Sequence, residues 1–135
     1  MKLILLAILE IIFAIGMASF WIYFFLVENK NPSRSDIFFA YERSFPLPDL
    51  FWITPGLLVS AIGVLNNKLY GFILTIAVSG GLIFLGLVDI SFNLQNKQYS
   101  TNVGDAILNI FINLACLIMG PIFIISATQY IGVIQ

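Results

Sequence analysis

The sequence predicts an all-α fold, an integral membrane four-helix bundle with a short interfacial helix in its first loop, and three observations support this fold class. Of its 135 residues, 60% are hydrophobic and only 10% are charged, against roughly 45–50% and 25% in soluble domains. The mean hydropathy is +1.01. Four apolar runs of spanning or near-spanning length alternate with polar turns, and a membrane helix needs about 20 mostly apolar residues. We therefore expect a single transmembrane domain over residues 1–135.

The first apolar run covers residues 3–27 and is interrupted only by Glu10. Lys2 before an apolar run is also typical of a cleaved signal peptide. The run is longer than the roughly 7–15 residues of a signal-peptide core, however, and a glutamate inside such a core is out of character. We therefore interpret residues 3–27 as a retained membrane helix.

A short helix is expected in the loop that follows, over residues 36–45. Ser35 can cap its N-terminus, and Asp36 places a negative charge in its first turn, where the helix dipole favours it. Its apolar side chains fall near one side, which is typical of a helix lying in the membrane interface: Ile37, Phe38, Tyr41 and Phe45. Pro46 and Pro48 are expected to end this helix and to redirect the chain.

Three further spans are predicted, at residues 50–65, 70–92 and 106–125. The first of these would be only about 24 Å long, somewhat short of the hydrocarbon core. Asn102 with Asp105 resembles a capping box at the start of the last span, and Gly120–Pro121 predicts a kink within it. Because their connections are short, these spans are expected to be antiparallel neighbours.

Basic residues lie on both sides of the predicted membrane. Those beside the long loop outnumber those beside the termini, and the positive-inside rule would put the long loop in the cytoplasm. Proteins with an even number of spans more often keep both termini inside. We favour the orientation with the termini inside.

The last two spans carry polar residues at helical spacing. Asp89 and Asn93 are four residues apart, and a stripe from Asp105 to Gly120 follows at steps of three or four, so each set shares one helix face. Polar groups within a membrane are costly and face a bundle interior, a cavity or a partner. The candidate ligand-binding residues are therefore Glu10, Asp89, Asn93, Asn109 and Asn113.

Two interpretations of these residues stay open. In one, Glu10 and Asp89 bind a cation, a proton or a polar head group in a pocket that has Trp21 and Tyr23 on its wall and residues 36–45 as a lid. In the other, amides and carboxylates hydrogen-bond one another and hold the helices together. A carboxylate near the middle of a span is a functional-site candidate by default. We expect Glu10 to point into the bundle, neutral or hydrogen-bonded.

The distance of a residue from the end of its predicted span gives its expected depth in the membrane. Asp89 is predicted to face Asn109 and Asn113 across a polar cavity, and Asp49 is expected at the rim. Small residues such as Gly16 are expected to allow close approach of helices. The aromatic residues near span ends are expected to be interfacial anchors: Trp21, Tyr23, Trp52 and Tyr70.

Several classes of function are disfavoured by composition. The chain has no histidine, which removes the usual general base and the commonest metal ligand. Its single cysteine, Cys116, excludes an intramolecular disulfide or a zinc cluster. The net charge is −1 with no basic block, so nucleic acid is not an expected partner. We expect no catalytic residue, no metal and no cofactor.

Two blocks, YERSFPLPD before the second span and GLIFLGLVDISFNLQNKQY at the end of the third, resemble those of small four-span membrane proteins of prokaryotes. The resemblance covers most of the chain and implies a multi-pass protein of the prokaryotic plasma membrane, without a particular activity. In architecture the chain is also similar to emopamil-binding (EXPERA) and DoxX-like proteins, which are small helical bundles. EXPERA members place acidic side chains in an intramembrane ligand cavity. The missing histidine argues against a sterol-isomerase activity, and no residue roles are carried over.

The leading hypothesis is a non-enzymatic membrane protein with a polar intramembrane cavity for a lipid-like or small amphipathic ligand. One alternative is an oligomeric ion or proton pathway, ringed by Glu10 or Asp89 from several copies. Another is an accessory subunit whose polar stripe packs against a different membrane protein. An enzyme ranks last, because the sequence contains neither a nucleophile–base pair nor a metal-binding set.

Overall fold

The computed structural model describes residues 1–100 and 103–134, and the structure is 88% helical. No strand occurs in these two ranges. Four helical segments are long and apolar enough to cross a membrane, which confirms the all-α class and the four predicted spans of a multi-pass membrane protein. They cover Leu3–Lys30, Asp36–Leu65, Leu69–Gln95 and Val103–Gly132. The predicted capping residue Asn102 lies outside the described residues.

The chain forms two compact units, Met1–Leu74 and Thr75–Gln135, which are described separately. In chain order, the first unit contains α1 (Leu3–Leu26), η1 (Glu28–Lys30), α2 (Asp36–Glu42), α3 (Pro46–Pro48), η2 (Asp49–Ile53), α4 (Thr54–Leu65) and the start of α5 (Leu69–Gln95). The second unit contains the rest of α5, η3 (Gln98–Ser100) and α6 (Val103–Ile134).

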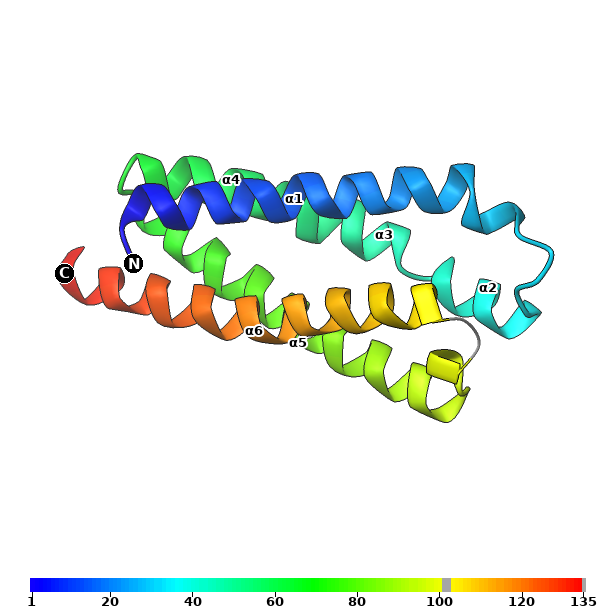
Figure 1. Cartoon of the computed structure of the whole chain (residues 1–135). Helices are drawn as coiled ribbons and strands as arrows, with labels where there is room; N and C mark the ends of the chain where they lie inside the picture. Colours follow the sequence, from blue (N-terminus) through cyan, green and yellow to red (C-terminus); the bar gives the residue numbers. More distant parts are fainter. Residues whose placement is uncertain (101–102, 135) are drawn as a thin grey trace. The chain divides into compact units, whose positions relative to one another are not determined.

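In the first unit, α1 and α4 run antiparallel and pack along each other (Figure 1). The fully buried residues Leu57, Ala61 and Val64 recur on α4 every three or four positions, the period of one helix face. On α1, Leu6, Glu10 and Ala14 are buried at steps of four residues. The opposite faces of both helices are apolar and exposed, as expected for helices surrounded by lipid.

The second membrane helix begins earlier than predicted. Pro46 and Pro48 do not simply end the preceding helix, because they form the first turn of the next one. Proline suits that position, since its fixed φ is helical and the N–H it lacks would have no intrahelical partner there. The backbone stays helical from Pro46 to Leu65, a length of about 30 Å. The helix therefore matches the hydrocarbon core, and the 50–65 span is corrected to begin four residues earlier.

A widened turn, η2, interrupts this helix directly before Pro55. Proline cannot donate to the carbonyl four residues earlier, and its ring crowds that carbonyl. In η2 the Thr54 N–H donates to the carbonyl of Asp49, five residues back, which is the spacing of a π-helix. Such turns recur at functional sites. This turn sets the direction in which the Asp49 side chain leaves the helix.

The predicted loop helix is confirmed as α2, although it ends at Glu42 and not at residue 45. Ser35 caps it as expected, because its hydroxyl accepts a hydrogen bond from the Phe38 N–H at 3.2 Å. Phe38 is buried, whereas Ile37 is exposed. The helix therefore packs inward through one aromatic ring. Its location in the membrane interface stays a prediction.

Close approach of backbones occurs where α4 turns into α5. A Cβ added at Gly63 would lie 2.5 Å from the Gly71 Cα, and one added at Gly71 would lie 2.5 Å from the Gly63 carbonyl carbon. Gly16 was expected to serve such an approach, but a Cβ there would meet nothing within 4 Å. The tight contact is therefore in the hairpin of α4 and α5, which the short turn between them brings together.

In the second unit, α5 and α6 are antiparallel neighbours, as predicted (Figure 1). Their backbones approach at Gly86, where a Cβ would lie 3.0 Å from the Leu117 side chain, and at Gly120, where it would lie 3.1 Å from the Ser79 carbonyl oxygen. Helix α6 continues through Pro121 to Ile134. The span predicted to end at residue 125 is therefore longer, because the apolar sequence continues past the proline.

We predict that Gly71→Ala destabilises the protein by about 1–3 kcal/mol, the usual cost of overpacking. The added methyl group would meet backbone atoms of Gly63 and Val64, which cannot move aside as a flexible side chain can. Gly80→Ala is the matched control on the same helix, because a Cβ at Gly80 meets nothing within 4 Å. Unfolding in mild detergent, followed by circular dichroism, measures both. Equal stability of the two variants would contradict the close hairpin contact.

Candidate functional site

A buried hydrogen bond joins the two membrane helices of the first unit. The indole Nε1–H of Trp21 on α1 donates to Oδ2 of Asp49 in η2 at 2.9 Å, across 28 residues of sequence. Trp21 is 2% exposed and Asp49 is 5% exposed. A hydrogen bond to a carboxylate is stronger than one between neutral groups. This contact therefore fixes α1 against the start of the second membrane helix.

Aromatic side chains pack around Trp21. Trp21, Phe24 and Phe38 form a buried group, which we call the Trp21 cluster, and partly buried apolar residues pack against it: Met17, Phe20, Phe39, Phe45 and Leu50. The Trp21 and Phe24 rings meet edge to face, with centroids 5.3 Å apart, a preferred aromatic geometry. The Asp49 carboxylate thus lies beside an apolar, aromatic environment, where a charge is costly unless polar groups or a cation compensate it.

A second polar group is buried at the same turn. The hydroxyl oxygen of Thr54 is buried and has no hydrogen-bond partner within the described ranges. Thr54 follows η2 directly, and its N–H closes the widened turn onto Asp49. Asp49 in η2 and Thr54 directly after it therefore carry side-chain oxygen atoms that can accept hydrogen bonds.

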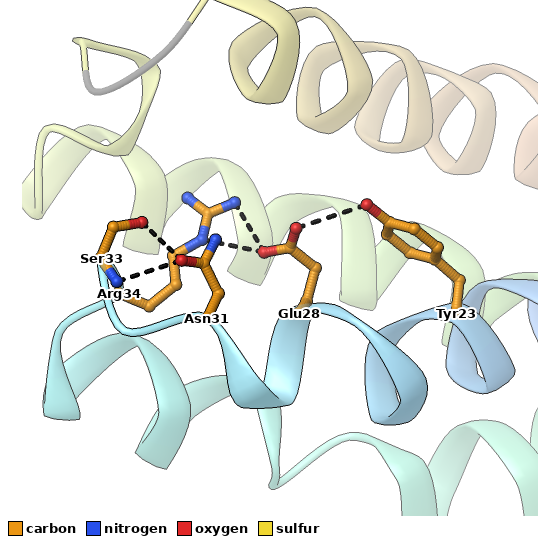
Figure 2. Close-up of polar contacts among 5 residues, drawn as sticks. All are labelled: Tyr23, Glu28, Asn31, Ser33 and Arg34. Atoms are coloured by element: carbon orange, nitrogen blue, oxygen red, sulfur yellow. Dashed lines mark hydrogen bonds and ion pairs between the residues drawn. The ribbon is translucent and has the colours of Figure 1, made fainter.

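The loop between α1 and α2 is organised by Glu28 (Figure 2). Its Oε2 forms an ion pair with the Arg34 guanidinium at 2.9 Å and accepts a further hydrogen bond from Arg34 Nε at 3.0 Å. Its Oε1 accepts from the Tyr23 hydroxyl at 3.4 Å. Nearby, the Asn31 side-chain oxygen accepts from the N–H and the hydroxyl of Ser33. These contacts fold the loop back over the end of α1.

Two arginines connect the same loop to α2. The Arg34 guanidinium lies 4.6 Å from the centre of the Phe38 ring, and the Arg43 guanidinium lies 4.9 Å from that of Phe39. Arg43 also donates from Nε to the Asn29 side-chain oxygen at 2.9 Å. Cation–π contacts of this kind are worth about 0.5–1 kcal/mol at exposed sites. The short helix α2 is therefore held at both ends by contacts that involve η1 and its neighbours.

Glu10 is fully buried on α1, so the expectation that it points away from lipid is confirmed. It lies 11 positions before Trp21 on one continuous helix, which separates the two along the helix axis by about 16 Å. Glu10 and Asp49 are therefore buried carboxylates of the same unit at different depths.

The predicted polar residues of the second unit divide into two groups. Asn113 and Asn93 are buried, whereas Asp89 and Asn109 are half-buried. Asn113 donates from Nδ2 to the Tyr99 hydroxyl at 3.0 Å. Tyr99 comes from η3, so this bond ties the turn between α5 and α6 to the α6 stripe. The predicted cavity between Asp89 and the two α6 asparagines stays a prediction.

For two residues of the site, the position predicted from the sequence differs from the position in the structure. Trp21 was expected at the interface and Asp49 at the rim, but both are buried and bonded to each other. Tyr23, Trp52 and Tyr70 are exposed, and their assignment as interfacial anchors stays a prediction. The signal for Asp49 was Pro46, which can begin a helix as well as end one, and so place Asp49 inside it.

Comparison with protein-family models, with curated proteins and with solved structures finds no match for this chain. Within residues 1–100 and 103–134, no group of three or more cysteine, aspartate and glutamate side chains is placed to hold a metal ion.

Trp21→Phe should destabilise the protein by about 1–3 kcal/mol, because it removes the donor to a buried carboxylate while keeping an aromatic ring. Trp52→Phe is the matched control, since Trp52 lies in η2 together with Asp49 but is 53% exposed. It should change stability by less than about 0.5 kcal/mol. Thermal unfolding of both variants in the same detergent is the measurement. A loss in the control as large as that in Trp21→Phe would rule out a special role for the buried bond.

Proposed function

We propose that the protein is a non-enzymatic integral membrane protein that binds a lipid-like or small amphipathic ligand at a polar intramembrane site. We further propose that it resides in a prokaryotic plasma membrane, on the basis of the two sequence blocks that resemble small prokaryotic membrane proteins. Membrane lipid is then both its solvent and the most accessible source of such a ligand.

The observation that carries this proposal is the complete burial of Glu10 within α1. A charged group near the centre of a membrane helix costs about 2.5–3.5 kcal/mol on insertion scales. Packing alone does not require such a residue, because an apolar side chain would fill the same space at no such cost. An acidic side chain at that depth is able to bind the polar or charged head group of a ligand, and this supports the proposal.

The remainder of the first unit is consistent with an amphipathic ligand. Asp49 supplies a second buried carboxylate near the long loop, and the Trp21 cluster supplies apolar surface beside it. Ligand sites are usually apolar surfaces with a few convergent polar groups. The helix α2, which Glu28, Arg34 and Arg43 attach to the loop and whose Phe38 packs in the Trp21 cluster, is the lid of this site in our proposal.

The burial of Glu10 also favours this proposal over an oligomeric ion pathway that is ringed by Glu10. A pore lined by Glu10 from several copies requires that side chain on the outer surface of each chain. Glu10 is instead buried within a single chain. An accessory subunit remains an outcome of the test below.

The test is to purify the protein from a prokaryotic host in dodecyl maltoside and to identify bound molecules by native mass spectrometry. We expect an amphipathic molecule bound at about one per chain. Glu10→Gln should weaken its retention roughly tenfold or more, since a hydrogen bond to a charged group is worth about 1.5–3 kcal/mol. Glu42→Gln, at the end of α2, is the matched control and should retain the molecule.

Two outcomes would contradict the proposal. One is that no amphipathic molecule is retained by the wild-type protein, or that Glu10→Gln retains it as well as wild type does. The other is that a second membrane protein co-purifies in a fixed ratio and no small molecule does, which would support the accessory-subunit alternative.

A further inference from the structure

The first unit brings together two features that bind the same kind of group. One is the Asp49 carboxylate, buried and oriented by the Trp21 indole N–H. The other is the Trp21 cluster, in which the Trp21 ring that donates to this carboxylate packs against Phe24 and Phe38. Carboxylates attract cations through their charge. Aromatic faces attract cations through their quadrupole, most strongly when water is excluded.

An organic ammonium group fits this combination better than a metal ion. A hard metal ion requires several oxygen ligands, and in the part of the chain that the structure describes no group of three or more acidic or cysteine side chains is placed to supply them. An alkylammonium group needs one carboxylate and surrounding aromatic rings.

Phe38 occupies part of the cluster from a separate element. Of the three buried rings, Trp21 and Phe24 belong to the long helix α1, whereas Phe38 belongs to the seven-residue α2. A helix that short has little stability of its own. Its other attachments are the contacts of Arg34 and Arg43 with the loop, and the same two guanidinium groups lie over the rings of Phe38 and Phe39. Movement of α2 would therefore withdraw one ring while Trp21 and Phe24 stay in place.

We propose that Trp21, Phe24 and Asp49 form a binding site for the ammonium head group of a cationic amphiphile, and that Phe38 fills this site when no ligand is bound. A benzyl side chain and a trimethylammonium group are similar in size, so one can replace the other. The exposed apolar faces of α1 and α4 offer a surface for the alkyl chain. This inference rests on the proposed function and names the class of ligand.

The test uses the two tryptophans of the chain. In a Trp52→Phe protein, Trp21 is the only tryptophan, and its emission reports on the site directly. The protein in dodecyl maltoside is titrated with dodecyltrimethylammonium, and separately with dodecanol and dodecanoate, which have the same chain length. We expect saturable quenching or shift of Trp21 emission, with half-saturation by the cation at least about tenfold below that of the other two probes.

Three variants in this background sharpen the test. Asp49→Asn keeps an oxygen that can accept the indole N–H but removes the charge, and should raise half-saturation by the cation to that of dodecanol. Phe38→Ala empties the site and should lower half-saturation. Asp105→Asn, in the first turn of α6 and outside the first unit, is the matched control and should leave the titration unchanged.

Equal responses to the three probes would overturn the inference, as would an unchanged titration in Asp49→Asn. If Asp49→Asn loses its helical circular dichroism, Phe38→Ala decides, and unchanged or weaker binding of the cation there refutes the site. An amphiphile that co-purifies with the protein while dodecyltrimethylammonium behaves like dodecanol refutes this inference and leaves the proposed function standing. An Asp49-dependent titration without any co-purifying molecule supports the head-group site and refutes the proposed resident ligand.

Discussion

A carboxylate buried beside aromatic rings must be compensated, and the Trp21–Asp49 hydrogen bond is the contact on which the first unit depends. It links α1 to η2 directly, since the two residues are 28 positions apart. It also fixes the Trp21 ring against which Phe24 and Phe38 pack. Loss of the donor would leave a buried acceptor unsatisfied, which costs more than the bond itself contributes. The position of the cluster is therefore tied to one polar contact.

The prolines of the second membrane helix determine where that carboxylate lies. Pro46 begins the helix, and this places Asp49 within its first turns. Pro55 removes an intrahelical donor, and the widened turn before it replaces the missing bond with one between Thr54 and Asp49. The same residue thus holds the turn through its carbonyl and meets Trp21 through its side chain. The backbone bond from Thr54 and the side-chain bond from Trp21 therefore both favour the same conformation of Asp49. Such agreement between local and long-range interactions is typical of sequences that specify one fold.

The sequence predicted the spans because each is a long apolar run, and lipid leaves few alternatives to a helix for such a run. It also predicted the Ser35 cap and the inward direction of Glu10, since both follow from local rules. The contacts of Trp21 with Asp49 and of Asn113 with Tyr99 were missed. Each joins residues on different elements, and their register depends on how the intervening turns fold. An aromatic residue near a span end is equally compatible with an interfacial anchor, and only the packing of α2 distinguishes the two.

The most direct test of this account is the indole N–H signal of Trp21 in a nitrogen-15 and proton NMR spectrum of the protein in detergent micelles. The signal is assigned by its absence in Trp21→Phe, and Trp52 serves as the internal reference. The account predicts a downfield-shifted Trp21 proton that exchanges with water far more slowly than that of Trp52, and loss of both properties in Asp49→Ala. A Trp21 proton that exchanges as fast as that of Trp52 and does not respond to Asp49→Ala would contradict the account.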